Sequence, residues 1–323
     1  MKKDAKICII GHNGMLGHAI WNKLKNMGYM NLIGCSLPEF DLCNQEHTKN
    51  FFEKNKPEYV FFLAAVAGGI QYKKSNPTDM LLKNLQMITN VMDFSCKNGC
   101  KKMINVCSAL LYPKEASIPL KEEDATYTNL GEVDTPYALA KAVGMQLARY
   151  YNQQYGMHFL TVVPCNFFGE YAPFQGERAG VVPSLIARIH NAKINNIARV
   201  EVWGTGNACR EFLNSQDVAS ACIYLMNSDT RYDLINIGRG FEFSIGEVAQ
   251  MIKDVVEYNG DLYFDASKPE GRAHMQLNTD RLFELGWRPS MDLCESITNA
   301  YRWYLTGYSE FIKVGGEVHD SVD

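Results

Sequence analysis

The stretch Ile7-Cys8-Ile9-Ile10-Gly11-His12-Asn13-Gly14-Met15-Leu16-Gly17 decides the fold of this chain. Its four apolar residues predict a buried strand, and the Gly-x-x-Gly-x-x-Gly turn that follows leads into a helix beginning near Met15. Glycines let the backbone of such a turn approach a pyrophosphate, whose charge is stabilised at the N-terminus of a helix. Because these glycines lie between a strand and a helix, we predict a dinucleotide-binding βαβ unit at this point.

Short apolar runs alternate with longer helical patterns up to about residue 165, which is typical of successive βαβ units. The expected strands are residues 7–10, 32–34, 59–63, 103–106 and 159–163, and the expected helices lie near 15–27, 45–55, 78–98 and 136–155. Most of these helices are long enough to be right-handed crossovers between parallel strands. We therefore predict an α/β fold with a doubly wound parallel sheet, the Rossmann fold.

The pattern changes after Pro164, where a loop with several glycines and prolines precedes a helix led by Pro183 and a strand at residues 199–203. This change predicts a second, smaller domain that binds the substrate. The chain is expected to return to the first domain and leave it again. The predicted boundaries are 1–165 plus about 212–240 for the dinucleotide-binding domain and 166–211 plus about 241–323 for the substrate-binding domain.

Composition and charge indicate a globular protein whose partners are small molecules. The 323 residues are 46% hydrophobic and 21% charged, and the net charge of −4 offers no basic field for a nucleic acid. The first apolar run is too short for a signal peptide or a membrane span, so we expect a cytoplasmic protein without a membrane segment. The ten cysteines are scattered and predict reduced thiols, and Cys96 and Cys100 lack partners at zinc-site spacing, so no metal is predicted.

Tyr137 and Lys141 are four residues apart in a helical pattern, so both side chains project from one face. A neighbouring ammonium favours the phenolate, which predicts a tyrosine whose pKa is lowered from about 10 toward neutral pH. Such a tyrosine would donate a proton to a carbonyl oxygen while a hydride arrives at carbon. Ser108 follows the strand at 103–106, at the sheet edge where open α/β folds bind ligands, and would hold the same oxygen.

A second feature of the sequence belongs to the cofactor side. The strand at 59–63 continues into the small residues Ala64, Ala65 and Ala67, against which a dinucleotide could lie. The second strand is followed by Gly34-Cys35-Ser36-Leu37-Pro38, without the acidic residue that indicates NAD or the arginine that indicates NADP. Ser36 would hydrogen-bond a phosphate and Asp41 would contact the adenosine, and the choice of nicotinamide stays open.

With these motifs in place, the sequence resembles the extended short-chain dehydrogenases/reductases that act on nucleotide sugars, and above all the GDP-L-fucose synthase family. The resemblance rests on Gly-His-Asn-Gly-Met-Leu-Gly (11–17), Ala-Ala-Val-Ala-Gly-Gly-Ile (64–70), Leu-Tyr-Pro-Lys (111–114), Tyr-Ala-Leu-Ala-Lys (137–141), Pro-Cys-Asn-Phe-Phe-Gly (164–169), Val-Trp-Gly-Thr-Gly (202–206) and Arg-Glu-Phe-Leu (210–213). It covers nearly the whole chain. It implies a catalytic triad of Ser108, Tyr137 and Lys141 and a GDP-linked keto sugar as substrate.

The motifs and the resemblance together predict two sets of binding residues. The cofactor set is Gly11, Asn13, Gly14, Met15, Leu16, Gly17, Ser36, Asp41, Leu42, Leu63, Ala64, Ala65, Ala67, Tyr137, Lys141, Pro164, Asn166 and Phe167. The resemblance implies a substrate set of Ser108, Asn166, Arg188, Trp203 and Arg210. The chemistry fits, because arginines can fork onto a diphosphate and an indole can stack on a base or sugar. Family habit favours NADP(H), and NAD(H) stays an alternative.

Two departures from the family concern proton transfer. GDP-L-fucose synthases also epimerise the sugar, with a cysteine two residues beyond the serine and a histidine before the Val-x-Pro helix, where this chain has Leu110 and Gly180. We therefore predict a reductase of a GDP-linked 4-keto 6-deoxyhexose or heptose in bacterial surface polysaccharide synthesis, without epimerisation. The close alternative is a bifunctional epimerase/reductase in which Cys107, Cys209 or His12 replaces the missing acid.

The sequence leaves two further alternatives for the function. A 4,6-dehydratase would need acidic residues where Ala109 and Leu110 stand, and a non-enzymatic dinucleotide sensor would be expected to lack the tyrosine or the lysine.

The helix near 136–155 has apolar or small residues on almost every face. One face can pack on the sheet, and the helix near 81–95 is the expected neighbour, but the face turned from the sheet must also be covered. This pattern predicts a homodimer joined through four helices.

Overall fold

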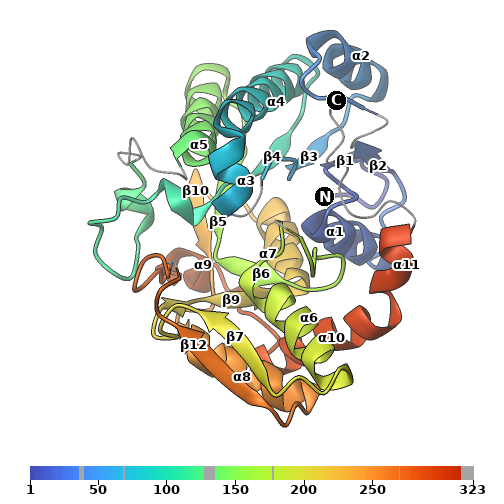
Figure 1. Cartoon of the computed structure of the whole chain (residues 1–323). Coiled ribbons are helices and arrows are strands. Elements are labelled where there is room, and N and C mark those ends of the chain that lie inside the picture. The colour runs from blue at the N-terminus through green and yellow to red at the C-terminus, as the bar shows by residue number, and fades with distance from the viewer. Residues whose placement is uncertain (36–39, 68–69, 127–134, 177, 269, 314–323) are drawn as a thin grey trace.

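The computed structural model describes residues 1–35, 40–67, 70–126, 135–176, 178–268 and 270–313. It confirms the predicted α/β fold: a six-stranded parallel sheet runs in the order β10-β5-β4-β3-β1-β2 (Figure 1). These strands are β1 (Ile7–Ile10), β2 (Leu32–Cys35), β3 (Tyr59–Phe62), β4 (Lys102–Val106), β5 (Phe159–Pro164) and β10 (Leu234–Ile237). Because the chain leaves β1 in one direction toward β2 and in the other toward β3, a ligand-binding crevice is expected beyond the ends of β1 and β3.

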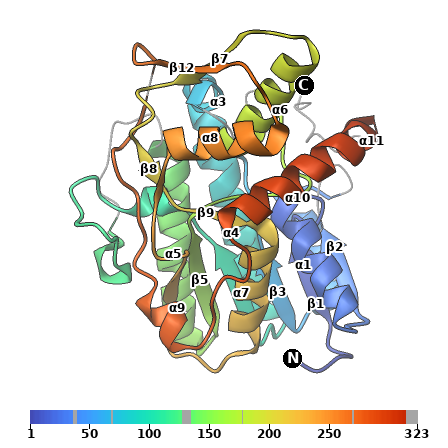
Figure 2. The same cartoon turned by 90° about the horizontal axis from the view of Figure 1, so that it is seen from below.

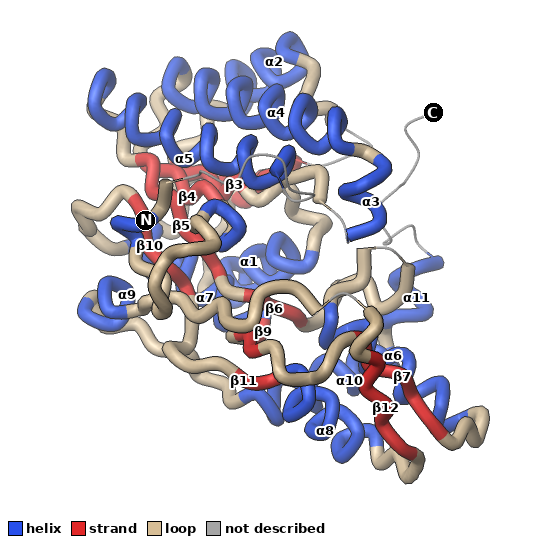
Figure 3. Tube along the Cα trace, turned by 60° about the vertical axis from the view of Figure 1, so that its left-hand side comes forward, coloured by secondary structure: helices blue, strands red, loops and turns tan. Residues whose placement is uncertain are grey.

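Helices cover both faces of the sheet. One face packs against α1 (Met15–Asn26) and α7 (Ser215–Asn227), and the other against α2 (Gln45–Asn55), α4 (Pro77–Lys97) and α5 (Thr135–Tyr155) (Figures 1 and 3). Alternate residues of a strand point to opposite faces, so Ile7 and Ile9 join the core under α1, whereas Cys8 and Ile10 join the core under α4. The short α3 (Ile70–Ser75) precedes α4, and the 3₁₀ turns η1 (Ala109–Leu111) and η2 (Glu122–Asp124) lie between β4 and α5.

A second group of elements packs around its own core beside the sheet (Figure 2). It contains the helices α6 (Val181–Ile194), α8 (Ile245–Val256), α10 (Leu293–Thr306) and α11 (Tyr308–Lys313). Its strands form three two-stranded pairs: β6 (Asn166–Phe168) with β9 (Phe212–Asn214), β7 (Arg199–Trp203) with β12 (Asp261–Asp265), and β8 (Cys209–Arg210) with β11 (Phe243–Ser244). The substrate side of the molecule is therefore built from short strands and their loops.

The packing refines the predicted domain division. β10 lies in the central sheet, as the expected return of the chain to the first domain requires. However, Leu277, Leu282 and Trp287 also pack into the core of that domain, and α9 (Asp280–Glu284) contacts β10. We therefore propose that the segment around 277–287 belongs with the dinucleotide-binding domain, although the predicted boundary at 241 places it in the other.

Two further findings concern the chain as a whole. Within the described residues, no helix combines the length and the apolar character that a membrane crossing needs. All ten cysteines lie in the described part of the chain, and all ten are free thiols.

Candidate active site

The glycine turn after β1 leaves no space for a side chain at Gly11 or Gly17. Gly11 has a φ of +87°, and a Cβ atom on it would lie 3.0 Å from the backbone nitrogen of Ala64. A Cβ atom on Gly17 would lie 2.1 Å from the carbonyl oxygen of Gly11. Gly14 is the N-cap residue of α1 and offers no side chain to its first N–H groups, which have no partners within the helix. A turn of this shape fits a bound pyrophosphate.

The other residues of the glycine turn and of the first turn of α1 differ in their exposure. Asn13 is exposed, Met15 is half-buried in the first turn of α1, and Leu16 is buried in the core. The first turn of α1 carries no acidic side chain that would repel an anion. Residues 11–17, which we call the cradle, therefore offer backbone N–H groups and several small residues to the phosphate of a dinucleotide.

The end of β3 forms the second wall of the crevice. The Leu63 N–H donates to the Ile10 carbonyl at 3.0 Å, which keeps this wall beside the glycine turn. Ala64 and Ala65 are half-buried and Ala67 is exposed. The buried Asn84 of α4 fixes Val66, since its Oδ1 accepts from the Val66 N–H at 3.0 Å and its Nδ2 donates to the Val66 carbonyl at 2.9 Å.

On the adenosine side, the structure describes Asp41 and Leu42, while Ser36 lies outside the described residues. The Asp41 carboxylate is exposed and accepts from the Cys43 N–H at 2.8 Å. Leu42 buries its side chain in the core, so its backbone is the part that can meet a cofactor. Asn90 of α4 holds the Leu42 carbonyl at 2.9 Å.

The three predicted catalytic residues are grouped around the end of β4. The Lys141 ammonium is buried and donates to the Val106 carbonyl at 2.8 Å, and it lies 5.8 Å from the centre of the Tyr137 ring. Ser108 follows two residues after that carbonyl and is the N-cap residue of η1, which packs against α5. Its Oγ accepts from the Leu110 N–H at 3.3 Å. The end of β4 and the first turns of α5 therefore position the group.

The expected direction of the tyrosine pKa is wrong in this structure. Burial raises the pKa of Tyr137, with a smaller contribution from Cys107, and burial lowers the pKa of Lys141. The physical reason is that removing the phenol from water disfavours the phenolate, while the ammonium is directed toward the Val106 carbonyl. Tyr137 is therefore a protonated phenol at neutral pH.

The residues after β5 lead from the sheet into the substrate side. Pro164 is buried at the end of β5, and the next residue donates its N–H to the Ile237 carbonyl at 2.8 Å. Asn166 is exposed at the start of β6, and its Nδ2 donates to the Glu211 carbonyl at 3.5 Å. Phe167 is half-buried and packs against the core of the sheet. These residues connect the central sheet to the second group of elements.

The remaining substrate-side residues come from three elements. Arg188 is half-buried on α6 and donates to the Glu201 carbonyl of β7, rather than lying on a solvated helix face. Trp203 ends β7 with 53% of its surface exposed, so it is not a core aromatic, and the Lys268 ammonium lies 6.0 Å from the centre of its ring. Arg210 is half-buried in β8 and donates to the Cys209 carbonyl at 2.6 Å.

The positions expected to lack proton carriers are open to solvent or apolar. Leu110 is half-buried in η1 next to Ser108, and Gly180 is exposed at the start of α6, where an added Cβ would meet Pro183 Cδ at 3.8 Å. Of the candidate replacements, Cys107 is buried and donates to the Lys141 carbonyl at 3.5 Å, and burial raises its pKa to about 11. Such a thiol is poorly suited to exchanging protons with a substrate.

The other two candidate replacements also have local roles. The Cys209 thiol contacts the Asn207 carbonyl at 3.3 Å, and burial raises its pKa, with smaller contributions from nearby carboxylates. The His12 ring lies over Gly34 at the end of β2, where a Cβ would approach it to 2.6 Å, and it is tilted against Trp21 at 5.5 Å. His12 therefore lies beside the second strand.

The structure adds three residues that the motifs do not identify. Asn84 supports the second wall of the crevice, Glu211 is a fully buried carboxylate beside Arg210, and Arg272 donates to the Tyr112 carbonyl at 3.1 Å. Asn84 lies in an otherwise mostly apolar helix stretch, which is a usable signal for a buried polar contact. Glu211 belongs to the Arg-Glu-Phe-Leu motif (210–213), whereas nothing in the sequence around Arg272 indicates its contact with the Tyr112 carbonyl.

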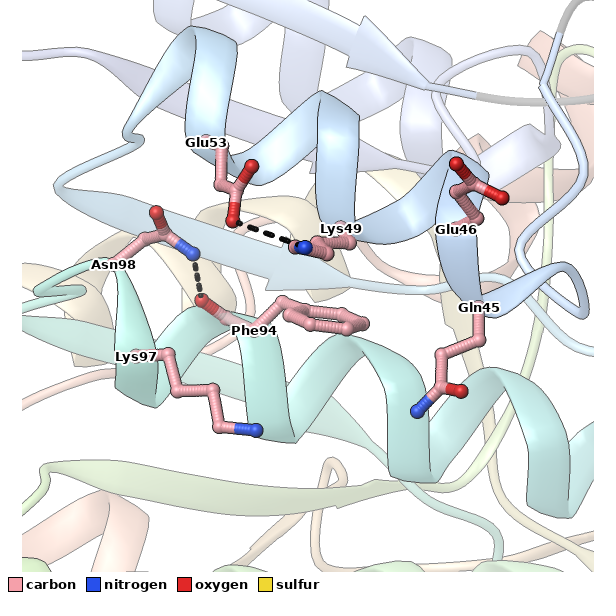
Figure 4. Close-up of a pocket in the computed structure, with 7 residues that line it drawn as sticks. All are labelled: Gln45, Glu46, Lys49, Glu53, Phe94, Lys97 and Asn98. Carbon is pink, nitrogen blue, oxygen red and sulfur yellow. Dashed lines mark hydrogen bonds and ion pairs between the residues drawn. The ribbon is translucent and has the colours of Figure 1, made fainter.

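A separate hollow lies between α2 and α4 (Figure 4). Polar and charged side chains line it, together with one aromatic ring: Gln45, Glu46, Lys49, Glu53, Phe94, Lys97 and Asn98. Lys49 is paired with Glu53 at 3.9 Å, Lys97 with Asp93 at 2.7 Å, and the Asn98 Nδ2 donates to the Phe94 carbonyl at 2.9 Å. None of the lining residues belongs to the predicted site, and we assign the hollow no role.

Comparison with known proteins identifies the class to which this fold and site belong. Residues 7–238 match the NAD dependent epimerase/dehydratase family, and the chain belongs to that family. Over 303 residues it is 37% identical to GDP-L-fucose synthase 1 of Arabidopsis thaliana, covering 94% of each protein. The resemblance to the GDP-L-fucose synthase family is thereby confirmed.

Two solved structures from Campylobacter jejuni are similar along almost their whole length. A GDP-mannoheptose C4 reductase with NADP bound is 34% identical with a TM-score of 0.85, covering 95% of this chain and 100% of that chain. A GDP-6-OMe-4-keto-L-xylo-heptose reductase is 32% identical with a TM-score of 0.88, covering 95% of this chain and 99% of that chain.

Proposed function

We propose that this chain catalyses the NADPH-dependent reduction of the C4 ketone of a GDP-linked 4-keto sugar, without epimerising it. The observation that carries the proposal is the grouping of Ser108, Tyr137 and Lys141 at the end of β4, with Leu110 and Gly180 where the family has proton carriers. The names of the similar proteins support a GDP-sugar substrate. A 6-deoxyhexose or heptose of a bacterial surface polysaccharide pathway, made in the cytoplasm, fits this chemistry.

Each residue of the triad has one task in the proposed reaction. NADPH, when bound, supplies the hydride that reduces the carbonyl carbon. Tyr137 donates its phenolic proton to the carbonyl oxygen, so that the ketone becomes an alcohol and the tyrosine becomes a phenolate. Ser108 donates a hydrogen bond to the same oxygen and orients the sugar. Lys141 stabilises the developing phenolate from the next turn of α5, and the phenolate takes up a proton from solvent before the next turnover.

The cofactor is proposed to be NADP(H), with NAD(H) as the alternative. The cradle of Gly11, Gly14 and Gly17 fits the pyrophosphate of either dinucleotide, because the backbone is closely packed at Gly11 and Gly17 and Gly14 adds no side chain in front of α1. The choice between them depends on the 2′ position of the adenosine ribose, for which Ser36 and Asp41 are the contacts predicted from the sequence. The similar heptose C4 reductase structure with NADP bound supports NADP(H).

The substrate screen tests this proposal directly. A set of GDP-linked 4-keto sugars is incubated with NADPH or NADH, the loss of absorbance at the reduced nicotinamide is followed, and the product is identified by NMR. Tyr137→Phe is the matched control because it removes only the proton donor. Turnover that is unchanged in this variant, or absent with every keto sugar in the wild type, would contradict the proposal and favour a non-enzymatic dinucleotide sensor.

A second experiment separates reduction alone from epimerisation with reduction. The enzyme and a 4-keto substrate are incubated in deuterated water without reduced cofactor, with a GDP-L-fucose synthase as the positive control. We expect no deuterium at C3 or C5, because Leu110 and Gly180 cannot carry a proton. Deuterium at either carbon would show that another group, such as Cys107, Cys209 or His12, has replaced the missing acid.

The proposed active form is a homodimer joined through α4 and α5. The two helices pack side by side over the sheet (Figure 3), and Leu82 and Tyr150 expose 51% and 55% of their surfaces on them. A second copy of the same helix pair would cover these side chains in a four-helix arrangement. Light scattering should give twice the chain mass for the wild type and a lower mass for Leu82→Asp. A monomeric wild type would refute this interface.

A further inference from the structure

We propose that Glu211 is a positioning residue that holds the wall carrying Arg210 in the shape needed to bind the anionic part of the substrate. This inference rests on the proposed function, in which Arg210 receives the diphosphate of a GDP-linked sugar. It concerns a carboxylate that does not touch the substrate. Its evidence is the set of contacts that join three separate segments at this one side chain.

The Glu211 carboxylate is completely buried and accepts three backbone hydrogen bonds. Its Oε1 accepts from the N–H groups of Arg239 at 3.0 Å and Gly240 at 2.8 Å, and its Oε2 accepts from the Leu277 N–H at 2.7 Å. The loop after β10 and the segment before α9 are thus joined through one side chain. The two segments are 37 residues apart in the chain, so no local hydrogen-bond pattern could hold them together.

These same two segments form the surroundings of Arg210. Phe243 at the end of the first segment pairs with Arg210 in the small antiparallel sheet of β8 and β11. In the second segment, Ala273 accepts from the Cys209 N–H at 2.7 Å, and a Cβ on Gly271 would lie 3.1 Å from an Arg210 guanidinium nitrogen. The position of Arg210 therefore depends on both segments at once.

Two further side chains lock the segments to each other. The Glu242 carboxylate accepts from the Met275 N–H at 2.6 Å and contacts His274 Nδ1 at 2.9 Å, and Gln276 donates to the Gly240 carbonyl at 2.6 Å. Asn166 joins the wall from β6 by donating to the Glu211 carbonyl at 3.5 Å. The wall thus connects two predicted substrate contacts, Arg210 and Asn166, through residue 211.

The close approach at this point explains why the carboxylate cannot be replaced by a larger or a donating group. A Cβ on Gly238 would lie 2.8 Å from Glu211 Oε1, so the loop after β10 passes directly against the carboxylate. A glutamine at position 211 has the same size but one acceptor oxygen in place of two. At least one of the three N–H groups would then face the amide NH₂, and a buried donor without a partner is destabilising.

The test compares Glu211→Gln with Asp217→Asn at pH 8. Asp217 is a matched control because it is also buried, and its carboxylate accepts from the N–H groups of Ser290 at 3.1 Å and Met291 at 3.2 Å, which lie outside the two segments joined by Glu211. We expect Glu211→Gln to raise the KM for the keto sugar about tenfold, equivalent to about 1.4 kcal/mol. The KM for NADPH and kcat should stay within about twofold, and Asp217→Asn should leave all three constants unchanged.

Calorimetric binding of GDP gives a second readout that does not depend on turnover. Glu211→Gln should weaken GDP binding by the same factor as the KM changes. An unchanged KM and GDP affinity, or an equal loss in Asp217→Asn, would overturn the positioning role while leaving the proposed reduction intact. If the wild type reduced no keto sugar but Glu211→Gln still weakened GDP binding, the proposed function would fall and the positioning role would stand.

Discussion

Asn84→Leu tests whether α4 supports the cofactor site. The substitution keeps the approximate volume of the side chain but removes its three hydrogen bonds, two to Val66 and one to the Met80 carbonyl at 2.6 Å. The N–H and carbonyl groups of Val66 would lose their partners on the wall that faces the glycine turn. The leucine would also place apolar atoms against both backbone groups.

The magnitude follows from the two backbone groups left unpaired. Each buried unsatisfied group costs about 1–3 kcal/mol, and Val66 is half-buried, so water can reach part of this site. We therefore expect the free energy of unfolding to fall by about 2–3 kcal/mol. Displacement of the wall should weaken NADPH binding about tenfold, or about 1.4 kcal/mol.

The matched control is Asn152→Leu. Asn152 on α5 makes the same pair of contacts with a strand residue: its Nδ2 donates to the Phe159 carbonyl at 2.9 Å and its Oδ1 accepts from the Phe159 N–H at 2.8 Å. Phe159 begins β5, at the end of the sheet opposite the glycine turn. Asn152→Leu should therefore lose similar stability without losing NADPH affinity.

The assay is a urea unfolding curve for stability together with calorimetric titration of NADPH for affinity. Unchanged NADPH affinity in Asn84→Leu, despite the expected loss of stability, would refute the role of the Val66 wall. An equal loss of affinity in Asn152→Leu would show that affinity reports stability in general rather than this wall.

Three more predictions use separate parts of the molecule. Tyr137→Phe should lower kcat by about 10²–10⁴ in a steady-state assay at saturating NADPH, as expected for a lost general acid; a retained rate would exclude this acid. Gly17→Ala should abolish NADPH binding, because the new Cβ would lie 2.1 Å from the Gly11 carbonyl; a soluble variant with normal affinity would contradict the cradle. Burial raises the pKa of Glu211 from 4.5 to about 7, so the folded state favours the protonated side chain, and the free energy of unfolding falls as the pH rises from 4.5 through 7 and the buried carboxylate forms. The wild type should therefore lose stability between pH 5 and 7.5 relative to Glu211→Gln, by on the order of 3 kcal/mol in urea unfolding, and parallel curves would oppose this assignment.

Local patterns were sufficient to predict the elements that carry the site. β1 and β7 have the predicted bounds, and α1 begins at the predicted Met15, because each is set by the periodicity of its own residues. The domain boundary at 241 stays a prediction, and the segment that we propose to move across it shows what local patterns leave open. Leu282 and Trp287 have no local feature that distinguishes packing under β10 from packing under α8, and tertiary contacts decide between them.

Long-range polar contacts are the part of the site that a single sequence could not reveal. The partners of Asn84 and Glu211 are backbone groups, which every residue has, so neither partner leaves a residue type to recognise. The predicted direction of the Tyr137 pKa shift was wrong for a related reason. The Tyr-x-x-x-Lys spacing predicts that an ammonium lies near the phenol and lowers its pKa. The opposite effect of burial and the contact of Lys141 with the Val106 carbonyl both depend on the packing of α5 against β4, which the spacing does not show.

The raised pKa of Tyr137 bears on the direction of the proposed reaction. Reduction needs a phenol that enters the reaction with its proton, and burial keeps Tyr137 in that form at neutral pH. Oxidation of the alcohol would instead need the phenolate, which this environment disfavours. Lys141, held on the Val106 carbonyl at 2.8 Å, then acts after proton transfer, when the phenolate has formed one turn away. The burial that contradicts an activated phenolate therefore leaves Tyr137 in the protonated form from which ketone reduction starts, and the phenolate formed in that step depends on Lys141 for its stabilisation.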